Sequence, residues 1–179
     1  MPKHQTKSQR QTHTDVEDFL TTITMLQKST PDDKKRPSIE KFVLENGRYF
    51  KPAPLPRGIP HGDVHNCFEN AFLLAVKNKT KFLYCEGYAT TGLLPVLHSW
   101  VIDTNGNVID NTWAPDGSNE KMEYFGIAFD WDYITKQFKT MKHFGLINDE
   151  KRKWPLLTGQ IKNFKADVGK ITKKTVDIL

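Results

Sequence analysis

The chain has 179 residues, a net charge of +5 and a hydrophobic content of 37%, which fits one domain with a substantial core. No stretch approaches the roughly 18 to 20 apolar residues of a membrane span, and residues 1–15 lack the apolar segment of a secretory signal. Two cysteines give no disulfide framework, so we expect a cytoplasmic protein with reduced thiols.

The N-terminal region predicts one helix between polar segments. Residues 1–14 are polar, and we expect them to form a disordered tail. Apolar residues follow helical spacing over residues 16–27, and Thr14 with Glu17 can form a capping box at the start. The sequence TPDDKKRP, residues 30–37, breaks this pattern and predicts a loop.

Four prolines lie within KPAPLPRGIP, residues 51–60. Because proline fixes φ and removes a backbone donor, this segment is predicted to be an extended path, not a helix or a central strand. A rigid connector that leads into the next element is the interpretation we favour. A proline-rich ligand for a partner protein is the alternative.

A helix is predicted to begin at Cys67. Asn66 and Glu69 fit the N-cap and N3 positions of a capping box. In this motif, the side chain of each residue accepts a hydrogen bond from the backbone N–H of the other. Apolar residues then recur at i, i+3, i+4, i+7 and i+8 and form one stripe: Phe68, Ala71, Phe72, Ala75 and Val76.

The next part of the chain predicts antiparallel strands followed by a helix. Four strands are expected, over residues 82–89, 98–103, 107–113 and 122–129, and DTNGN is the turn between the second and the third. Asp130 can cap a helix that Gly145 ends. This order indicates an α+β fold with one domain over residues 15–150 and its core over residues 61–145.

The C-terminal segment carries much of the positive charge. Residues 151–179 contain eight Lys or Arg residues and two acids, which is a local charge of +6. A solvated basic extension is the simplest interpretation, and the docking of an acidic partner is the alternative. Aromatic residues are few here, so nucleic acid is not an expected partner.

Cys67, His98 and Asp110 stand in an order that suits thiol-based acyl transfer. The reactive form of a cysteine is the thiolate, which the free N–H groups and the positive dipole end of a helix start favour. A neighbouring imidazole can hold the ion pair and later protonate a leaving group. A carboxylate on the far ring nitrogen fixes the orientation of the imidazole.

The register of the predicted hairpin decides whether His98 and Asp110 can meet. A two-residue turn at Asn105-Gly106 would point the two side chains to opposite faces, because side chains alternate along a strand. A three-residue loop over residues 104–106 makes them diagonal neighbours on one face, and it needs a left-handed Gly106. A triad therefore requires the three-residue loop, which the sequence permits.

A cysteine at a helix start, H-S-W on a strand, a glycine turn and V-I-D-N-T-W together resemble the transglutaminase-like branch of the papain-like thiol enzymes. The resemblance covers residues 61–130. It implies a nucleophile helix packed on a small antiparallel sheet, and cleavage or transfer at amide, peptide, isopeptide or thioester bonds. By this resemblance Cys67 is the nucleophile, His98 the general base and Asp110 the residue that orients His98. Phe68 departs from the animal transglutaminases, which have a tryptophan there.

Further residues are candidates for contacts with a substrate. The Cys67 backbone N–H is the natural first donor of an oxyanion hole, and Asn66, His65 or the backbone near the proline-rich segment can supply the second. The Asn66 side chain cannot both cap the helix and donate to an oxyanion, and capping is the role that we favour for it. Glu86 is a candidate carboxylate near the thiol, or else an edge residue, and Trp100 is a candidate pocket wall.

Other interpretations of these residues stay open. Cys67 alone fits a small buried apolar residue. The alternating His61, Asp63 and His65 with Cys67 suit zinc, but no second ligand pair with finger-like spacing follows, so we expect no metal. Because the glycine-rich phosphate loops are absent from the sequence, we expect no cofactor. A non-catalytic binding or inhibitor protein on the same fold is the alternative function.

Overall fold

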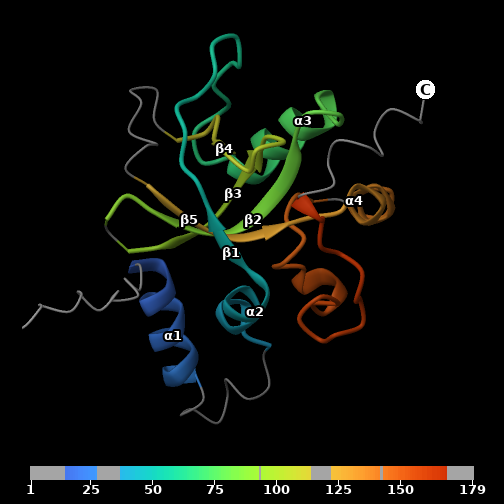
Figure 1. Ribbon diagram of the computed structural model, residues 1–179. Coiled ribbons are helices and arrows are strands. Elements are labelled where there is room, and N and C mark those ends of the chain that lie inside the picture. Colours follow the sequence, from blue (N-terminus) through green and yellow to red (C-terminus); the bar gives the residue numbers. More distant parts are fainter. Residues whose placement is uncertain (1–14, 28–36, 93, 114–121, 142, 169–179) are drawn as a thin grey trace, which may run out of the picture.

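The computed structural model describes residues 15–27, 37–92, 94–113, 122–141 and 143–168, and Figure 1 shows its ribbon. Within these ranges the chain forms four α-helices and a five-stranded antiparallel sheet. The expected combination of helices with an antiparallel sheet is confirmed. The predicted tail 1–14, with the capping residue Thr14, and most of the predicted loop 30–37 lie outside the described residues.

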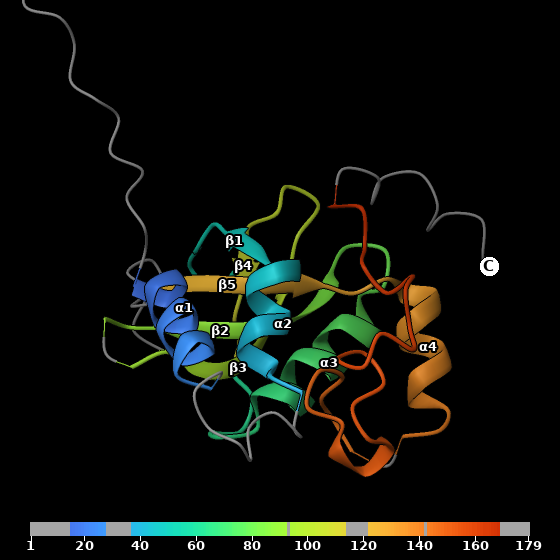
Figure 2. The same ribbon diagram turned by 90° about the horizontal axis from the view of Figure 1, so that it is seen from below.

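Two N-terminal helices, α1 (Asp15–Gln27) and α2 (Ile39–Asn46), lie side by side against the sheet (Figures 1 and 2). The helix predicted over residues 16–27 is thus confirmed. Ser38 caps α2, because its hydroxyl accepts a hydrogen bond from the backbone N–H of Lys41 at 3.0 Å. No helix in the described ranges is long and apolar enough to cross a membrane.

The sheet has the strand order β1-β5-β2-β3-β4. The strands are β1 (Arg48–Phe50), β2 (Leu83–Thr90), β3 (Val96–Ile102), β4 (Val108–Ile109) and β5 (Glu123–Ala128). The chain just after β1 meets β4 at the other edge, where the backbone N–H of Val108 donates to the Lys51 carbonyl at 2.8 Å. The two edges therefore meet at one end, and the sheet curls into a half-barrel with an inner and an outer face.

Each face of the sheet has its own apolar core. The outer core receives residues from all four helices, including α3 (Cys67–Lys77) and α4 (Trp131–Phe138). The inner core is formed chiefly by strand residues, with Phe50, Trp100 and Tyr124 among its buried aromatic side chains. Because α3 packs against β2 and β3, its first residue lies close to the strands that carry the other candidate site residues.

Two predicted elements are shorter than expected. β4 was predicted over residues 107–113 but ends at Ile109, because the carboxylate of Asp110 accepts the backbone N–H groups of Thr112 and Trp113 and turns the chain. The predicted helix before Gly145 ends much earlier, at Phe138. The N–H groups of residues 140 and 141 both bond to the carbonyl of residue 137, which closes a turn there.

The helix start at Asp130 is confirmed, since its side chain accepts the backbone N–H groups of Asp132 at 2.9 Å and Tyr133 at 3.3 Å. Gly145 lies in the later loop with a φ of 104°. Its left-handed conformation serves this loop and does not end α4.

The segment after residue 150 is packed against the domain as far as residue 168. It begins with a 3-10 turn, η3 (Glu150–Arg152), and it buries Leu156 and Phe164 in the outer core. The backbone N–H of Ala166 donates to the Ala128 carbonyl at 2.9 Å. The described part of the predicted basic extension thus belongs to the folded unit.

Candidate active site

The hairpin of β3 and β4 has the three-residue loop that places His98 and Asp110 on one face. The backbone N–H of Asp103 donates to the Asn107 carbonyl at 3.0 Å, which leaves residues 104–106 as the loop. Gly106 has a φ of 80°, a conformation that glycine adopts without steric cost. The register that a triad requires is therefore confirmed, and the two-residue turn is excluded.

His98 and Asp110 form a buried pair in the half-barrel. The His98 Nε2 lies 2.7 Å from the Asp110 Oδ2, and the side chains are 2% and 0% exposed. The same oxygen accepts a hydrogen bond from the Tyr124 hydroxyl at 2.9 Å. The Oδ1 accepts the backbone N–H groups of Thr112 at 2.9 Å and Trp113 at 3.1 Å. The carboxylate is thus fixed by four donors.

These contacts decide the charge state of the pair. Burial raises the pKa of the Asp110 carboxyl, but the hydrogen bond and the charge of His98 outweigh it, and the pKa lies below its usual value. Burial also lowers the pKa of His98, while its hydrogen bonds to Asp110 and to Cys67 raise it to about 9. At neutral pH the pair therefore consists of an imidazolium and a carboxylate.

Cys67 contacts the same imidazole. The Cys67 side chain is close enough to the ring to raise the pKa of His98, and because Nε2 is bonded to Asp110, Nδ1 is the ring nitrogen left for the sulfur. The indole of Trp113 stacks on the His98 ring at a centroid distance of 4.1 Å and an interplanar angle of 15°. The imidazole is thus held between a thiol, a carboxylate and an aromatic plane.

Asn70 joins the helix that carries Cys67 to the hairpin. Its side-chain N–H groups donate to the Asp63 carbonyl at 2.7 Å and to the Thr112 hydroxyl at 3.0 Å, and its amide oxygen accepts the Asp63 N–H at 3.2 Å. One buried side chain therefore ties the loop before Cys67 to the hairpin arm that follows Asp110.

Gly62 makes a second connection between the same two segments. Its backbone N–H donates to the Asn111 carbonyl at 2.7 Å. A Cβ atom at this position would lie 2.2 Å from the Cγ of Asn70, so only glycine allows this close approach. The close packing of Gly62 against the Asn70 amide therefore fixes the position of the loop before Cys67 relative to α3.

Sequence reasoning missed Asn70, Gly62 and Tyr124. Asn70 had a signal, because it is a polar side chain one helical turn after Cys67 within an apolar helix. Tyr124 had a weaker signal, a hydroxyl within the largely apolar strand that was predicted over residues 122–129. Gly62 had no signal in the sequence, because the need for a glycine there depends on its contact with Asn70.

The predicted capping box at α3 is wrong. Asn66 occupies the N-cap position with φ −105° and ψ 36°, and its side chain makes no capping hydrogen bond. These angles differ from the extended conformation in which an N-cap side chain folds back on the helix. The preceding His65 has a φ of 68°, and both side chains are exposed. The Asn66 amide is thus not committed to capping.

Glu86 and Trp100 lie in the interior and not at the surface of the site. Both are 0% exposed, so neither can contact a substrate in this structure. Glu86 accepts the Tyr84 hydroxyl at 2.8 Å and the backbone N–H groups of Leu146 at 2.5 Å and Ile147 at 2.9 Å. Burial raises the pKa of this carboxyl. Its contacts anchor the segment after α4 to the sheet.

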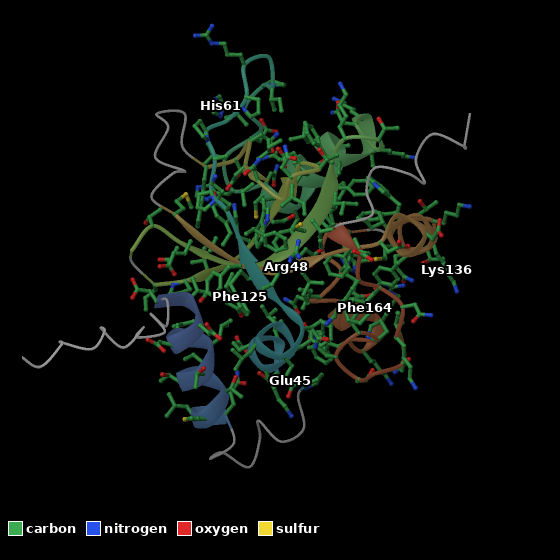
Figure 3. The ribbon with its side chains drawn as sticks, viewed as in Figure 1. Glu45, Arg48, His61, Phe125, Lys136 and Phe164 are labelled. Carbon is green, nitrogen blue, oxygen red and sulfur yellow. The ribbon has the colours of Figure 1, made fainter. Side chains whose placement is uncertain are left out.

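The loop before α3 forms part of a hollow beside the site. This hollow has a volume of about 300 Å³, and Gly62, His61, Asn70 and Asn111 are among its lining residues. Figure 3 shows His61 in this loop. Within the described ranges, no group of three or more His, Cys, Asp or Glu side chains could hold a metal ion. The candidate zinc ligands therefore do not converge.

Comparison of the chain with protein-family models, with curated proteins and with solved structures gave no match. The chemistry of the site is therefore inferred from its geometry. Cys67, His98 and Asp110 lie together, with the partly buried sulfur beside an imidazole that is hydrogen-bonded to a buried carboxylate. Such an arrangement can move a proton between the sulfur and a bound molecule.

Proposed function

We propose that the protein is a thiol-dependent hydrolase or acyltransferase that acts on an amide, peptide, isopeptide or thioester bond, on a core of the papain-like and transglutaminase-like kind. The contacts of His98 carry this proposal. Its imidazole is hydrogen-bonded to Asp110 at 2.7 Å and is close enough to the Cys67 side chain for that group to raise its pKa, and Cys67 is the first residue of α3.

In the first half of the proposed reaction, the Cys67 sulfur attacks the carbonyl carbon of the substrate as the thiolate. The imidazolium of His98 next to the sulfur and the N-terminus of α3 both favour this anion. A carbon–sulfur bond forms, and His98 gives its proton to the leaving amine or thiol as the carbon–nitrogen or carbon–sulfur bond breaks. The product is a thioester on Cys67.

In the second half, the neutral imidazole accepts a proton from water or from an acceptor amine. That oxygen or nitrogen attacks the thioester carbonyl, and the Cys67 thiolate leaves beside a reprotonated His98. Asp110 stays ionised throughout and keeps the ring oriented and its charge compensated. Water gives hydrolysis, and an amine gives acyl transfer.

Both halves pass through an oxyanion that needs hydrogen-bond donors. The backbone N–H of Cys67 is at the start of α3, where helix N–H groups have no partner within the helix. The Asn66 side-chain amide is the better candidate for the second donor, because it is exposed and makes no capping bond. His65, which is exposed beside it, is the other candidate.

Alkylation by iodoacetamide at pH 7 tests the proposal. Cys85 is an internal control, because it is 0% exposed and burial raises the pKa of its thiol. We expect selective labelling of Cys67, and a rate that falls by about a hundredfold in His98→Ala. Peptide mass spectrometry of the folded protein measures both sites.

Absence of Cys67 labelling in the folded protein would contradict the proposal and would favour a non-catalytic binding protein on the same fold. Labelling that His98→Ala leaves unchanged would show an ordinary exposed thiol. It would remove the imidazole from the proposed mechanism.

A further inference from the structure

A second hollow lies at the opposite end of α3 from Cys67. It has a volume of about 830 Å³ and is lined by the end of α3, the loop that follows and α4: Val76, Lys77, Asn78, Lys79, Thr80, Lys81, Trp131, Asp132, Thr135, Lys136 and Lys139. A helix rises about 1.5 Å per residue, so Lys77 lies about 15 Å along α3 from Cys67. We name this hollow the lysine groove; it shares Lys77 and Asn78 with the hollow beside the candidate active site, but none of the three candidate catalytic residues lines it.

The rim of the lysine groove is strongly positive. Five of its lining residues are lysines, and Asp132 is the one acid among them. All five lysines are exposed, and none is ion-paired with an acid in the described part of the chain. Lys136 projects outward from α4 at the edge of the molecule (Figure 3). The rim therefore offers several uncompensated cations to a ligand.

The adjoining surface is apolar. A smaller hollow of about 270 Å³ shares Val76, Lys79 and Trp131 with the groove and adds the side chains Phe72, Ile134 and Phe138. The Lys79 Nζ lies 5.8 Å from the centre of the Trp131 ring. The buried indole N–H of Trp131 has no hydrogen-bond partner within the described residues. Lysines thus surround an aromatic and aliphatic floor.

We propose that the lysine groove binds an acidic segment of a partner protein. Apolar side chains of this segment contact the Trp131 floor, and its carboxylates contact the lysines of the rim. An amphipathic segment in an apolar groove is a common mode of peptide recognition, and a charged rim adds rate and specificity. The apolar floor and the lysine rim are adjacent, so one amphipathic acidic segment can contact both.

Nucleic acid fits this surface less well. Proteins that bind single strands stack successive bases on a row of aromatic side chains, whereas Phe72 and Phe138 beside Trp131 are stacked on each other at a centroid distance of 3.6 Å. The chain also has no glycine-rich phosphate loop. The acidic segment can be part of a substrate on which Cys67 acts, and this extension rests on the proposed function. The binding of the segment to the groove does not depend on Cys67.

Fluorescence anisotropy with a labelled twelve-residue peptide, EELLEELLEEFL, tests the proposal on the full chain. We expect saturable binding at low salt that weakens by at least about tenfold in the double variant Lys79→Glu with Lys136→Glu. The matched control, Lys151→Glu with Lys162→Glu, makes the same change of charge at exposed residues outside the groove. We expect it to change the affinity by less than about twofold.

A second peptide, with glycine in place of each leucine and phenylalanine, tests the apolar floor, and we expect at least about fivefold weaker binding. Cys67→Ala should bind the first peptide as the wild type does, which separates this proposal from the proposed function. Equal losses in the two double variants would overturn the groove assignment, as would the absence of binding. Tighter binding of an oligothymidine through Lys79 and Lys136 would assign the groove to nucleic acid instead.

Discussion

Two histidine–aspartate pairs lie within the described part of the chain, and they differ in what surrounds them. The His98 Nε2 lies 2.7 Å from Asp110, and the His143 Nε2 lies 3.2 Å from Asp149. His98 is 2% exposed and His143 is 23% exposed, while both carboxylates are 0% exposed. The Asp149 carboxylate is also bonded to an arginine, Arg152.

The other ring nitrogen distinguishes the two pairs. In the first pair, the His98 Nε2 is bonded to Asp110, so Nδ1 is the nitrogen left for the nearby Cys67 sulfur. In the second pair, the His143 Nδ1 lies 3.3 Å from the backbone carbonyl of Phe144. Arg152 also donates to the Gln137 side chain at 2.6 Å, so the second pair fastens the C-terminal segment to α4. Of these two pairs, the His98 pair is the one that suits the proposed chemistry, because a thiol can occupy the free side of its ring.

Replacement of each histidine gives the largest expected contrast. In His98→Ala the thiol loses the cation that favours its reactive form, and we expect Cys67 alkylation at pH 7 to slow by about a hundredfold. In His143→Ala we expect a change of less than about twofold. A similar loss of rate in both variants would show that folding, and not the imidazole beside the sulfur, sets the reactivity.

Replacement of each aspartate sharpens the same contrast. Asp110→Asn removes the charge that holds the imidazolium, so we expect the pKa of His98 to fall and Cys67 alkylation to slow by about thirtyfold. Asp149→Asn loses the pairing with Arg152, and we expect it to lower stability while Cys67 keeps its rate. Urea denaturation beside the alkylation assay separates the two effects, and unchanged alkylation in Asp110→Asn would contradict the orienting role.

The raised pKa of His98 makes the stability of the fold depend on pH. The pKa of His98 is raised from 6.5 to about 9, so its contribution is fully present below pH 6.5 and is lost as the pH rises through 9. We expect the free energy of unfolding to fall by on the order of 2 kcal/mol between pH 7 and pH 9.

Urea denaturation at several pH values measures this decline, and Asp110→Asn should reduce it. A stability that stays constant or rises between pH 7 and pH 9 in the wild type would contradict the assigned ion pair.

The smallest expected effect concerns the connection between α3 and the hairpin. Asn70→Ala leaves the Asp63 backbone and the Thr112 hydroxyl without a partner, so we expect a loss of about 1.5 kcal/mol and about fivefold slower alkylation of Cys67. Asn78→Ala is the control, because Asn78 donates to the Leu74 carbonyl at the other end of α3 at 3.0 Å. Equal rates in the two variants would remove the positioning role of Asn70.

The features that sequence could predict were local ones. Helical spacing located α1 and α3, and Asp130 marked the start of α4. Gly106 permitted the three-residue loop that a triad requires, but it left the two-residue turn open, and the structure decided between them. Each of these rests on the conformational preference of one residue or on a short periodic pattern.

The features that sequence missed depend on contacts between distant segments. β4 is short because the Asp110 carboxylate takes up two nearby N–H groups, which a strand pattern does not reveal. Glu86 is buried because it receives the N–H groups of Leu146 and Ile147, sixty residues later. Asn66 does not cap α3, because its backbone angles differ from the extended conformation that capping requires. Such tertiary contacts override local propensity.

Formation of an acyl-enzyme tests the central claim most directly. We expect incubation with p-nitrophenyl acetate at pH 7 to add one acetyl group to Cys67, visible by intact and peptide mass spectrometry, which hydroxylamine removes. The acetyl group should be absent from Cys67→Ala and should form far more slowly in His98→Ala, while His143→Ala behaves as the wild type. Acetylation confined to lysines, or a Cys67 thioester that forms equally fast without His98, would contradict the assignment of this site.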